Sequence, residues 1–195
     1  MKDKDWSAHW DGLEALINYR FSAAGRRAMK AACLHGSMSQ EIPGAADLRV
    51  PRRRLAWIGD RVVGLVLADL LALRSPDEDV GSLNAPFDQL KKRTSLARAA
   101  RRTGLSDFIV ASANGLAQAQ QDNPLGEFLE AVVGAVYRDP DGGFDAARQV
   151  AKGLLAASVE SYFDPEERAR EREDLERQLD ALLAAAGGAS SAGEP

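Results

Sequence analysis

The 195-residue chain contains one cysteine and two histidines, and this scarcity excludes two classes of protein. The single cysteine, Cys33, cannot form an internal disulfide bond, and His9 and His35 lack the spacing of metal-ligating pairs. We therefore expect neither a disulfide scaffold nor a Cys/His metal centre. Cys33 is predicted to pack in the core and His35 to have a structural role. A chain with this cysteine usage suits a reducing compartment, the cytoplasm.

Long apolar runs and an excess of positive charge are also missing. The longest apolar run, VVGLVLADLLAL, is interrupted by Asp69 and is too short to cross a bilayer. The opening residues include acids and lack the apolar core of a signal peptide, so we expect no membrane partner and no targeting peptide. The net charge of -4 gives no overall attraction to nucleic acid, so any RNA binding requires a local basic surface.

Strand patterns are nearly absent, whereas apolar residues recur at helical spacing along the chain. We predict an all-α fold whose central helix covers about residues 52–73, because that segment is apolar on nearly every side. Further helices are predicted over 124–139 and 144–162, and a polar loop over 114–124.

Composition also predicts the domain organisation. A chain of this length normally forms one main domain, which we place over residues 1–162. Residues 163–186 are rich in acid and base pairs at i,i+4 spacing and are expected to form a charged helix. The Gly, Ala and Ser composition of residues 187–195 predicts a disordered tail.

Asp60 lies in the most apolar predicted helix, where an isolated ionised carboxylate is costly to bury. It needs a cation, a metal ion or hydrogen-bond donors, unless it points outward. Glu127 and Glu130 share one face at the start of another apolar helix. Taken alone, that pair also fits a solvated acidic corner. Three carboxylates that met in one cleft would form a site of hard oxygen ligands suited to Mg²⁺.

Several segments match the motifs of one family in the same order. RRRLAWIGD resembles N-E-R-L-E-F-L-G-D, and the following SPDEDVGSL resembles the turn P-x-x-x-E-G-x-L. LGEFLEAVVGAVYRDPDGG resembles L-A-D-x-x-E-A-x-x-G-A-I-Y-x-D-G-G, and TSLARAARRTGL resembles N-R-E-S-L-A-x-x-A-x-x-x-G-L. With LEALINYRF and LHGS, these segments resemble the ribonuclease III family over about residues 12–157. The resemblance implies the helical ribonuclease III fold and metal-dependent cleavage of double-stranded or structured RNA in RNA processing.

The resemblance also implies a set of site residues. Asp60 matches the last position of L-G-D, and Glu130 matches the closing Glu of the second motif. These two would be the catalytic residues, and together with Glu127, which replaces an Asp, they would bind Mg²⁺ or Mn²⁺ as its substitute. The sequence departs from the family at two positions, where Ala56 replaces the Glu of L-E-F and Arg53 replaces the outer Glu of N-E-R.

These departures leave two alternatives open. In the first, water takes the place of the missing ligand and the enzyme is active. In the second, Arg53 lies on the same stripe as Asp60 and pairs with the acids. The protein is then an inactive RNA-binding or ribonucleoprotein scaffold subunit. A helical partner-binding protein without an RNA role would require the basic segment to face away from the cleft.

The resemblance further implies a homodimer that joins two clefts into one valley for duplex RNA. Trp57 would lie at the dimer contact, although a core tryptophan is the commoner situation. A local basic segment is the candidate RNA-binding surface, with a solvated helix face as the ordinary alternative. It consists of Lys91, Lys92, Arg93, Arg98, Arg101 and Arg102. Arg52–Arg54 form either a second basic site or a solvated helix start. Residues 163–186 do not resemble a double-stranded RNA-binding domain, so RNA affinity is expected to come from the dimer or from another protein.

Overall fold

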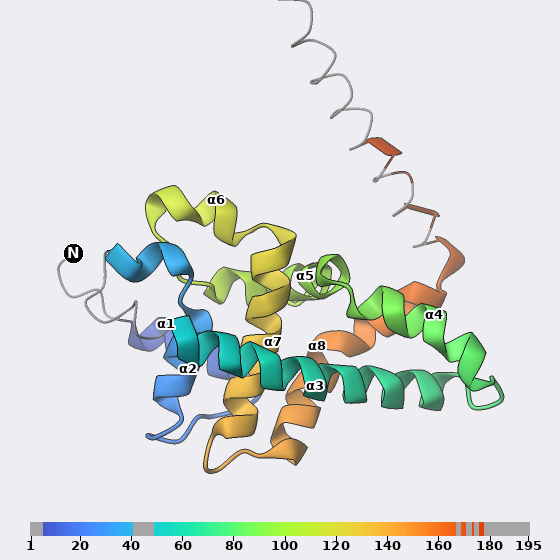
Figure 1. Cartoon of the computed structure of the whole chain (residues 1–195), viewed down its shortest axis with the longest axis horizontal. Helices are drawn as coiled ribbons and strands as arrows, with labels where there is room; N and C mark the ends of the chain where they lie inside the picture. The colour runs from blue at the N-terminus through green and yellow to red at the C-terminus, as the bar shows by residue number, and fades with distance from the viewer. Residues whose placement is uncertain (1–5, 41–48, 167–168, 171–172, 174–175, 178–195) are drawn as a thin grey trace, which may run out of the picture. The chain divides into compact units, whose positions relative to one another are not determined.

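A computed structural model describes residues 6–40, 49–166, 169–170, 173 and 176–177, and their regular elements are helices (Figure 1). The α-helices are α1 (Ser7–Leu16), α2 (Arg26–Cys33), α3 (Arg49–Arg74), α4 (Val80–Lys91), α5 (Arg93–Arg102), α6 (Leu116–Ala119), α7 (Asp122–Arg138) and α8 (Phe144–Phe163). Within the described ranges, β pairing is limited to an isolated bridge between Leu34 and Val110. The predicted all-α class is confirmed.

The polar segment 114–124 is more ordered than the sequence predicts. It contains the short helix α6 and the first turn of α7, so the predicted continuous loop is wrong. The Ser112 hydroxyl accepts a hydrogen bond from the backbone N–H of Gly115 at 3.0 Å, which starts the turn that precedes α6. Ala119 is fully buried at the end of α6, and this burial offsets the polar composition of the segment.

The central helix of the fold is α7, which packs against α2, α3 and α5. Its residues from Phe128 to Val136 are buried on every side. Helix α3 is buried on one side only, because Trp57, Leu65 and Leu73 are exposed on it. The prediction that α3 is the central helix is therefore wrong. Its near-continuous apolar character reflects a second apolar face, which stays exposed in the part of the chain that the structure describes.

Two glycines allow α3 and α7 to cross in close contact (Figure 1). A Cβ atom on Gly59 would overlap the carbonyl oxygen of Glu130, and a Cβ atom on Gly134 would overlap the carbonyl oxygen of Leu55. Any larger residue at either position would push the two backbones apart. Since Asp60 follows Gly59 directly, this crossing brings Asp60 next to the turn of α7 that carries Glu130.

The chain divides into two compact units, Met1–Val159 and Glu160–Pro195. Most of the second unit lies outside the described residues. The predicted domain boundary at residue 162, the charged helix over 163–186 and the tail over 187–195 therefore stay predictions. Among the helices that the structure describes, none combines the length and the apolar character that a bilayer crossing requires.

Candidate active site

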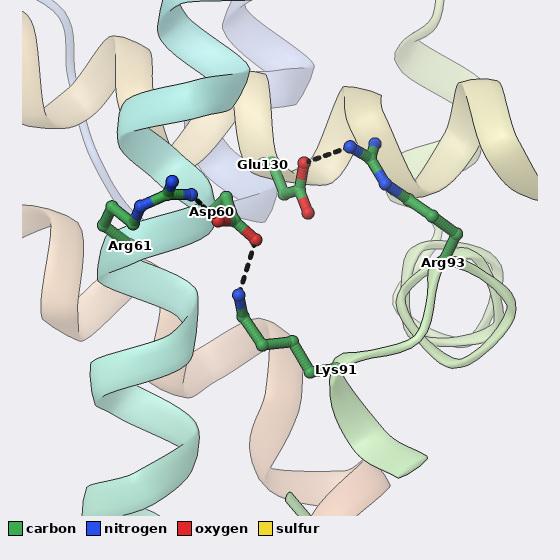
Figure 2. A network of polar contacts seen from close by, with 5 residues as sticks. All are labelled: Asp60, Arg61, Lys91, Arg93 and Glu130. Atoms are coloured by element: carbon green, nitrogen blue, oxygen red, sulfur yellow. Dashed lines mark hydrogen bonds and ion pairs between the residues drawn. The ribbon is translucent and has the colours of Figure 1, made fainter. Parts of the chain in front are cut away.

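Asp60 lies on α3 and is half-buried between two cations (Figure 2). Its Oδ1 accepts a hydrogen bond from Nζ of Lys91 at 2.7 Å, and its Oδ2 pairs with the guanidinium group of Arg61. Burial alone would raise the pKa of Asp60, but the hydrogen bond and charge of Lys91, together with Arg61, hold it below its usual value. Asp60 is therefore an ionised carboxylate in a partly buried position, and its partners are side-chain cations.

Glu130 lies on α7 and is the most deeply buried carboxylate of the site, with 2% of its surface exposed. Nη2 of Arg93 lies 3.0 Å from its Oε2, at ion-pair distance. That oxygen nevertheless makes no hydrogen bond of good geometry with any described residue. Burial raises the pKa of Glu130 to about 7, with Arg93 pulling it down and the negative charge of Asp60 pushing it further up.

The structure brings the three predicted acids into one electrostatic cluster. Asp60 and Glu127 both raise the pKa of Glu130, which requires that their charges lie near its carboxyl group. Figure 2 shows the carboxylates of Asp60 and Glu130 directed toward the same space from different helices. Glu127 is half-buried one turn before Glu130 on α7. The fold thus places Asp60 beside Glu130, with the charge of Glu127 nearby, and a site made by all three carboxylates stays a prediction (Figure 2).

Two cations of the predicted RNA-binding segment are directed into this cluster. Lys91 is the last residue of α4 and Arg93 is the first residue of α5. Lys92, between them, has an extended backbone with φ -60° and ψ 145°, and its own Nζ donates to Oε1 of Gln89. The change of direction at Lys92 sends Lys91 to Asp60 and Arg93 to Glu130 (Figure 2).

The other cations of the segment lie along α5. Arg98 is half-buried, and Arg101 and Arg102 are exposed. Arg101 forms an ion pair with Asp122 at 2.8 Å, and Arg102 donates a hydrogen bond to the carbonyl oxygen of Ala157 at 2.8 Å. The basic segment is therefore divided between the carboxylate cluster and the surface of α5, and it is not one continuous solvated face.

Arg53 does not neutralise the cleft in the way that the inactive alternative expects. Its side chain is exposed and forms no ion pair with Asp60, Glu127 or Glu130 in the described part of the chain. Seven residues of helix correspond to about 10 Å along the axis, so Arg53 starts two turns away from Asp60. The guanidinium group that reaches Glu130 belongs to Arg93. Ala56 is buried, and it presents no oxygen where the family pattern has a carboxylate.

Arg52 is buried, unlike Arg53 and Arg54. The prediction that Arg52–Arg54 form one basic site or one solvated helix start is therefore wrong for Arg52. Only 8% of its surface is exposed, and neither Nε nor Nη2 has a hydrogen-bond partner among the described residues. Burial lowers the pKa of Arg52, whereas the nearby charge of Glu127 raises it. Helical spacing could have predicted this burial, because Arg52 shares a face of α3 with the buried residues Leu55, Ala56 and Gly59.

The donors of the cluster are of a kind that a divalent cation prefers. Asp60 and Glu130 offer carboxylate oxygens, and Oε2 of Glu130 is a buried acceptor without a hydrogen bond. The number of such donors is small. Among the described residues, no three His, Cys, Asp or Glu side chains are grouped so that they could hold a metal ion. Lys91 and Arg93 already contact the carboxylates of Asp60 and Glu130, so a hard cation held here would have few protein ligands and would need water to complete its coordination.

An exposed apolar surface lies on α3 beside the cluster. A hollow of about 420 Å³ is lined by Trp57, Ile58, Arg61, Val62, Leu65, Tyr137 and Phe144. Trp57 is 63% exposed and Leu65 is 56% exposed, so the alternative that Trp57 is a core residue is wrong. The guanidinium carbon of Arg61 lies 5.0 Å from the centre of the Trp57 ring, which connects this surface to Asp60.

Sequence comparison identifies the family. A family model described as ribonuclease-III-like matches residues 25–159, and the chain belongs to this family. The ribonuclease 3 of Methylocella silvestris is 34% identical over 161 residues, which cover 82% of this chain and 61% of that protein. The ribonuclease 3 of Ruegeria pomeroyi is 33% identical over 155 residues, covering 78% and 64%. The chain thus spans less than two thirds of the length of these relatives.

Solved structures confirm the fold. A nuclease domain of ribonuclease III from Campylobacter jejuni, described for flexibility in a region involved in dimer formation, superposes with a TM-score of 0.59 at 25% identity. The match covers 75% of this chain and 95% of that chain. A second structure of that nuclease domain gives a TM-score of 0.58 at 24% identity and covers 84% and 97%. The predicted ribonuclease III-like fold is confirmed.

Proposed function

We propose that the chain is a ribonuclease III-type endoribonuclease that hydrolyses phosphodiester bonds of double-stranded or structured RNA in RNA processing. The observation that carries this proposal is the juxtaposition of Asp60 and Glu130, from two helices distant in sequence, at the crossing of α3 and α7. Membership of the ribonuclease-III-like family and relatives named ribonuclease 3 support it. The cytoplasm remains the expected location.

The proposal includes a divalent cation, Mg²⁺ with Mn²⁺ as a substitute, held by Asp60, Glu130 and, through water, Glu127. When bound, such an ion lowers the pKa of an attacking water and stabilises charge on the phosphodiester oxygens. The support from the structure is the donor type and Oε2 of Glu130, which is ion-paired with Arg93 but accepts no hydrogen bond from any described residue. Ala56 reduces the number of anionic ligands, so we expect weaker metal affinity than a complete carboxylate set would give.

The two catalytic carboxylates would have different proton states near neutral pH. Asp60 has a lowered pKa and remains ionised. In the metal-free chain Glu130, with a pKa of about 7, is protonated in an appreciable fraction of molecules. Because a metal ligand must be deprotonated, cation binding would displace this proton, and metal affinity should rise with pH through about 7.

The proposed enzyme acts as a homodimer on duplex RNA. The exposed surface around Trp57 is apolar and hollowed, as an interface requires, and it adjoins Asp60 through Arg61. Lys92 and Arg98, with the exposed arginines of α5, would contact phosphates of the RNA backbone. Lys91 and Arg93 would face the scissile region, because they are already directed to the carboxylates.

Cleavage of an end-labelled RNA duplex in Mg²⁺ or Mn²⁺ tests the proposed activity. We expect products with short 3′ overhangs from the wild type and a loss of at least about 100-fold in rate for Asp60→Ala, since metal-ligand and acid–base contributions are of that size. Glu78→Gln, which changes an exposed carboxylate in the loop after α3, serves as the matched control and should cleave like the wild type. Equal products from wild type and Asp60→Ala in both metals would contradict the proposal.

An inactive RNA-binding subunit is a second candidate function. One observation favours it, namely that side-chain cations already lie on both Asp60 and Glu130 while Ala56 supplies no ligand. This candidate expects a duplex RNA gel shift that persists in a chelator, together with an absence of Asp60-dependent cleavage. A chelator-resistant shift combined with Asp60-dependent cleavage would rule it out.

A further inference from the structure

We propose that Lys91 is a built-in cation of the carboxylate cleft, which neutralises Asp60 and competes with divalent cations for that carboxylate. This inference deepens the proposed function and rests on it for the identity of the cleft. It makes Lys91 a positioning residue that sets the metal affinity of the site. The run of basic residues in the sequence places Lys91 in the predicted RNA-binding segment instead.

The contact between Lys91 and Asp60 is short and partly buried. Nζ of Lys91 lies 2.7 Å from Oδ1 of Asp60, and the side chains are 27% and 22% exposed. Partial burial strengthens such a pair relative to an ion pair in bulk water, because the effective dielectric constant is lower. Arg61 also contacts Asp60, but its side chain is mostly exposed and lies over the Trp57 ring. Lys91 is therefore the partner of Asp60 on the cleft side.

Gly64 provides the space in which the Lys91 side chain lies. This glycine is one helical turn after Asp60 on α3, and a Cβ atom built on it would stand 3.1 Å from Cε and 3.6 Å from Nζ of Lys91. The ring of Phe87 would be 3.8 Å from the same point. The lysine stem thus passes over a bare part of the α3 backbone to reach Asp60. Any side chain at position 64 would crowd this path.

The corner between α4 and α5 fixes the position from which Lys91 starts. Lys91 ends α4, and the extended Lys92 turns the chain into α5. On the other side of the corner, Arg93 is held against α7 by Gly126, where a Cβ atom would lie 2.9 Å from the carbonyl oxygen of Arg93. The packing of the backbone around this corner therefore positions both Lys91 and Arg93 at the carboxylates. An ammonium group in this place supplies positive charge beside Asp60 without requiring a bound ion.

Titration with Mn²⁺ alone, followed by calorimetry in the absence of RNA, tests the role of Lys91. Removing the ammonium charge in Lys91→Met should tighten Mn²⁺ binding at least about tenfold, a change of about 1.4 kcal/mol that is modest for a charge at hydrogen-bond distance. Lys91→Arg keeps the charge and should bind Mn²⁺ like the wild type. Lys152→Met removes an exposed lysine of α8 and is the matched control, with unchanged affinity expected.

Two further variants distinguish the loss of the Lys91 charge from misfolding and from indirect effects on Mn²⁺ affinity. Lys91→Gln keeps a polar side chain of similar length without the charge, and it replaces Lys91→Met if circular dichroism shows that the methionine variant is unfolded. Gly64→Ala should displace the lysine stem and tighten Mn²⁺ binding by a smaller factor. Unchanged Mn²⁺ affinity in both uncharged variants would overturn the proposal.

Failure of this inference is distinguishable from failure of the proposed function. If the wild type cleaves RNA and Mn²⁺ affinity does not depend on Lys91, the cation role is wrong and the nuclease proposal stands. If no variant cleaves RNA but Lys91→Met gains Mn²⁺ affinity that Asp60→Asn removes again, the cation role stands and the nuclease proposal fails. Both readouts use the full chain.

Discussion

A Cβ atom on Gly59 would lie 2.9 Å from the backbone nitrogen of Gly134, so the two glycines meet where α3 and α7 cross. This contact decides the distance between the helices that carry Asp60 and Glu130. Glycine at both positions removes the side chains that would otherwise separate the backbones. The relative position of these two carboxylates therefore depends on a packing contact that includes neither of their side chains.

Gly59→Ala and Gly134→Ala should each destabilise the fold by about 2 to 4 kcal/mol, because the added methyl group overlaps the backbone of the partner helix. Urea unfolding followed by circular dichroism measures this change. Gly153→Ala is the control, since a Cβ atom on Gly153 of α8 would meet nothing within 4 Å. It should be neutral or stabilise by up to about 1 kcal/mol. Equal effects at all three positions would contradict the assigned role of the crossing.

Glu130 should make the stability of the fold depend on pH. The unfolded chain loses the Glu130 proton near the ordinary pKa of 4.5, whereas the folded chain keeps it up to about 7. The contribution of Glu130 to the free energy of unfolding is therefore greatest below about pH 4.5, and it falls as the pH rises to 7. Glu130→Gln should gain about 2 kcal/mol relative to the wild type between pH 5 and pH 8, as measured by urea unfolding. A constant difference across that range would show that the buried carboxyl group is not the cause, and Glu78→Gln should show no trend.

Trp57→Glu should convert the proposed dimer into a monomer. The charge would fall on the exposed apolar hollow that also includes Leu65, Tyr137 and Phe144, and burying it at an interface would cost several kcal/mol. Light scattering at micromolar concentration gives the mass directly. Val80→Glu places the same charge on an exposed apolar residue outside the hollow and should leave the mass unchanged. A wild type that is already monomeric would remove the dimer from the proposal.

Ala56→Glu should raise metal affinity by about tenfold or more, because it restores a carboxylate one helical turn before Asp60. The position is buried, and its i,i+4 spacing puts the new side chain on the same face of α3 as Asp60. Mn²⁺ titration measures the affinity, and RNA cleavage measures whether the added ligand increases the rate. Lower Mn²⁺ affinity in a folded Ala56→Glu protein would show that the cleft cannot accept a further carboxylate.

Helical periodicity predicted the main architecture because α3, α7 and α8 each carry a long apolar stripe. The family motifs likewise pointed to Asp60, Glu127 and Glu130 as one metal-binding cluster. The structure directs Asp60 and Glu130 toward the same space (Figure 2), and the three-carboxylate site stays a prediction. The sequence did not reveal which helix is central. Exposed apolar residues such as Trp57 and Leu65 have the same composition as core residues, and only packing distinguishes them.

The sequence also could not predict which acids Lys91 and Arg93 contact. Lys91 and Arg93 fall in a run of basic residues that indicates a solvated surface, yet one non-helical residue, Lys92, turns both toward acids. Arg53 shares a stripe with Asp60, but the distance along the axis leaves it in solvent. Direction depends on a backbone dihedral angle and on the approach of other helices, and neither is encoded in the spacing of charges.

The absence of a side chain at Gly64 leads to an expectation about the sequences of homologues. A lysine at the end of α4 lies over α3 most easily where that turn has no side chain, so we expect the two positions to change together among homologues. Co-occurrence of glycine and lysine there would mark members whose cleft carries its own counter-ion. A larger residue in place of the glycine would mark members in which the lysine must take another path to Asp60 or be replaced by a cation from solution.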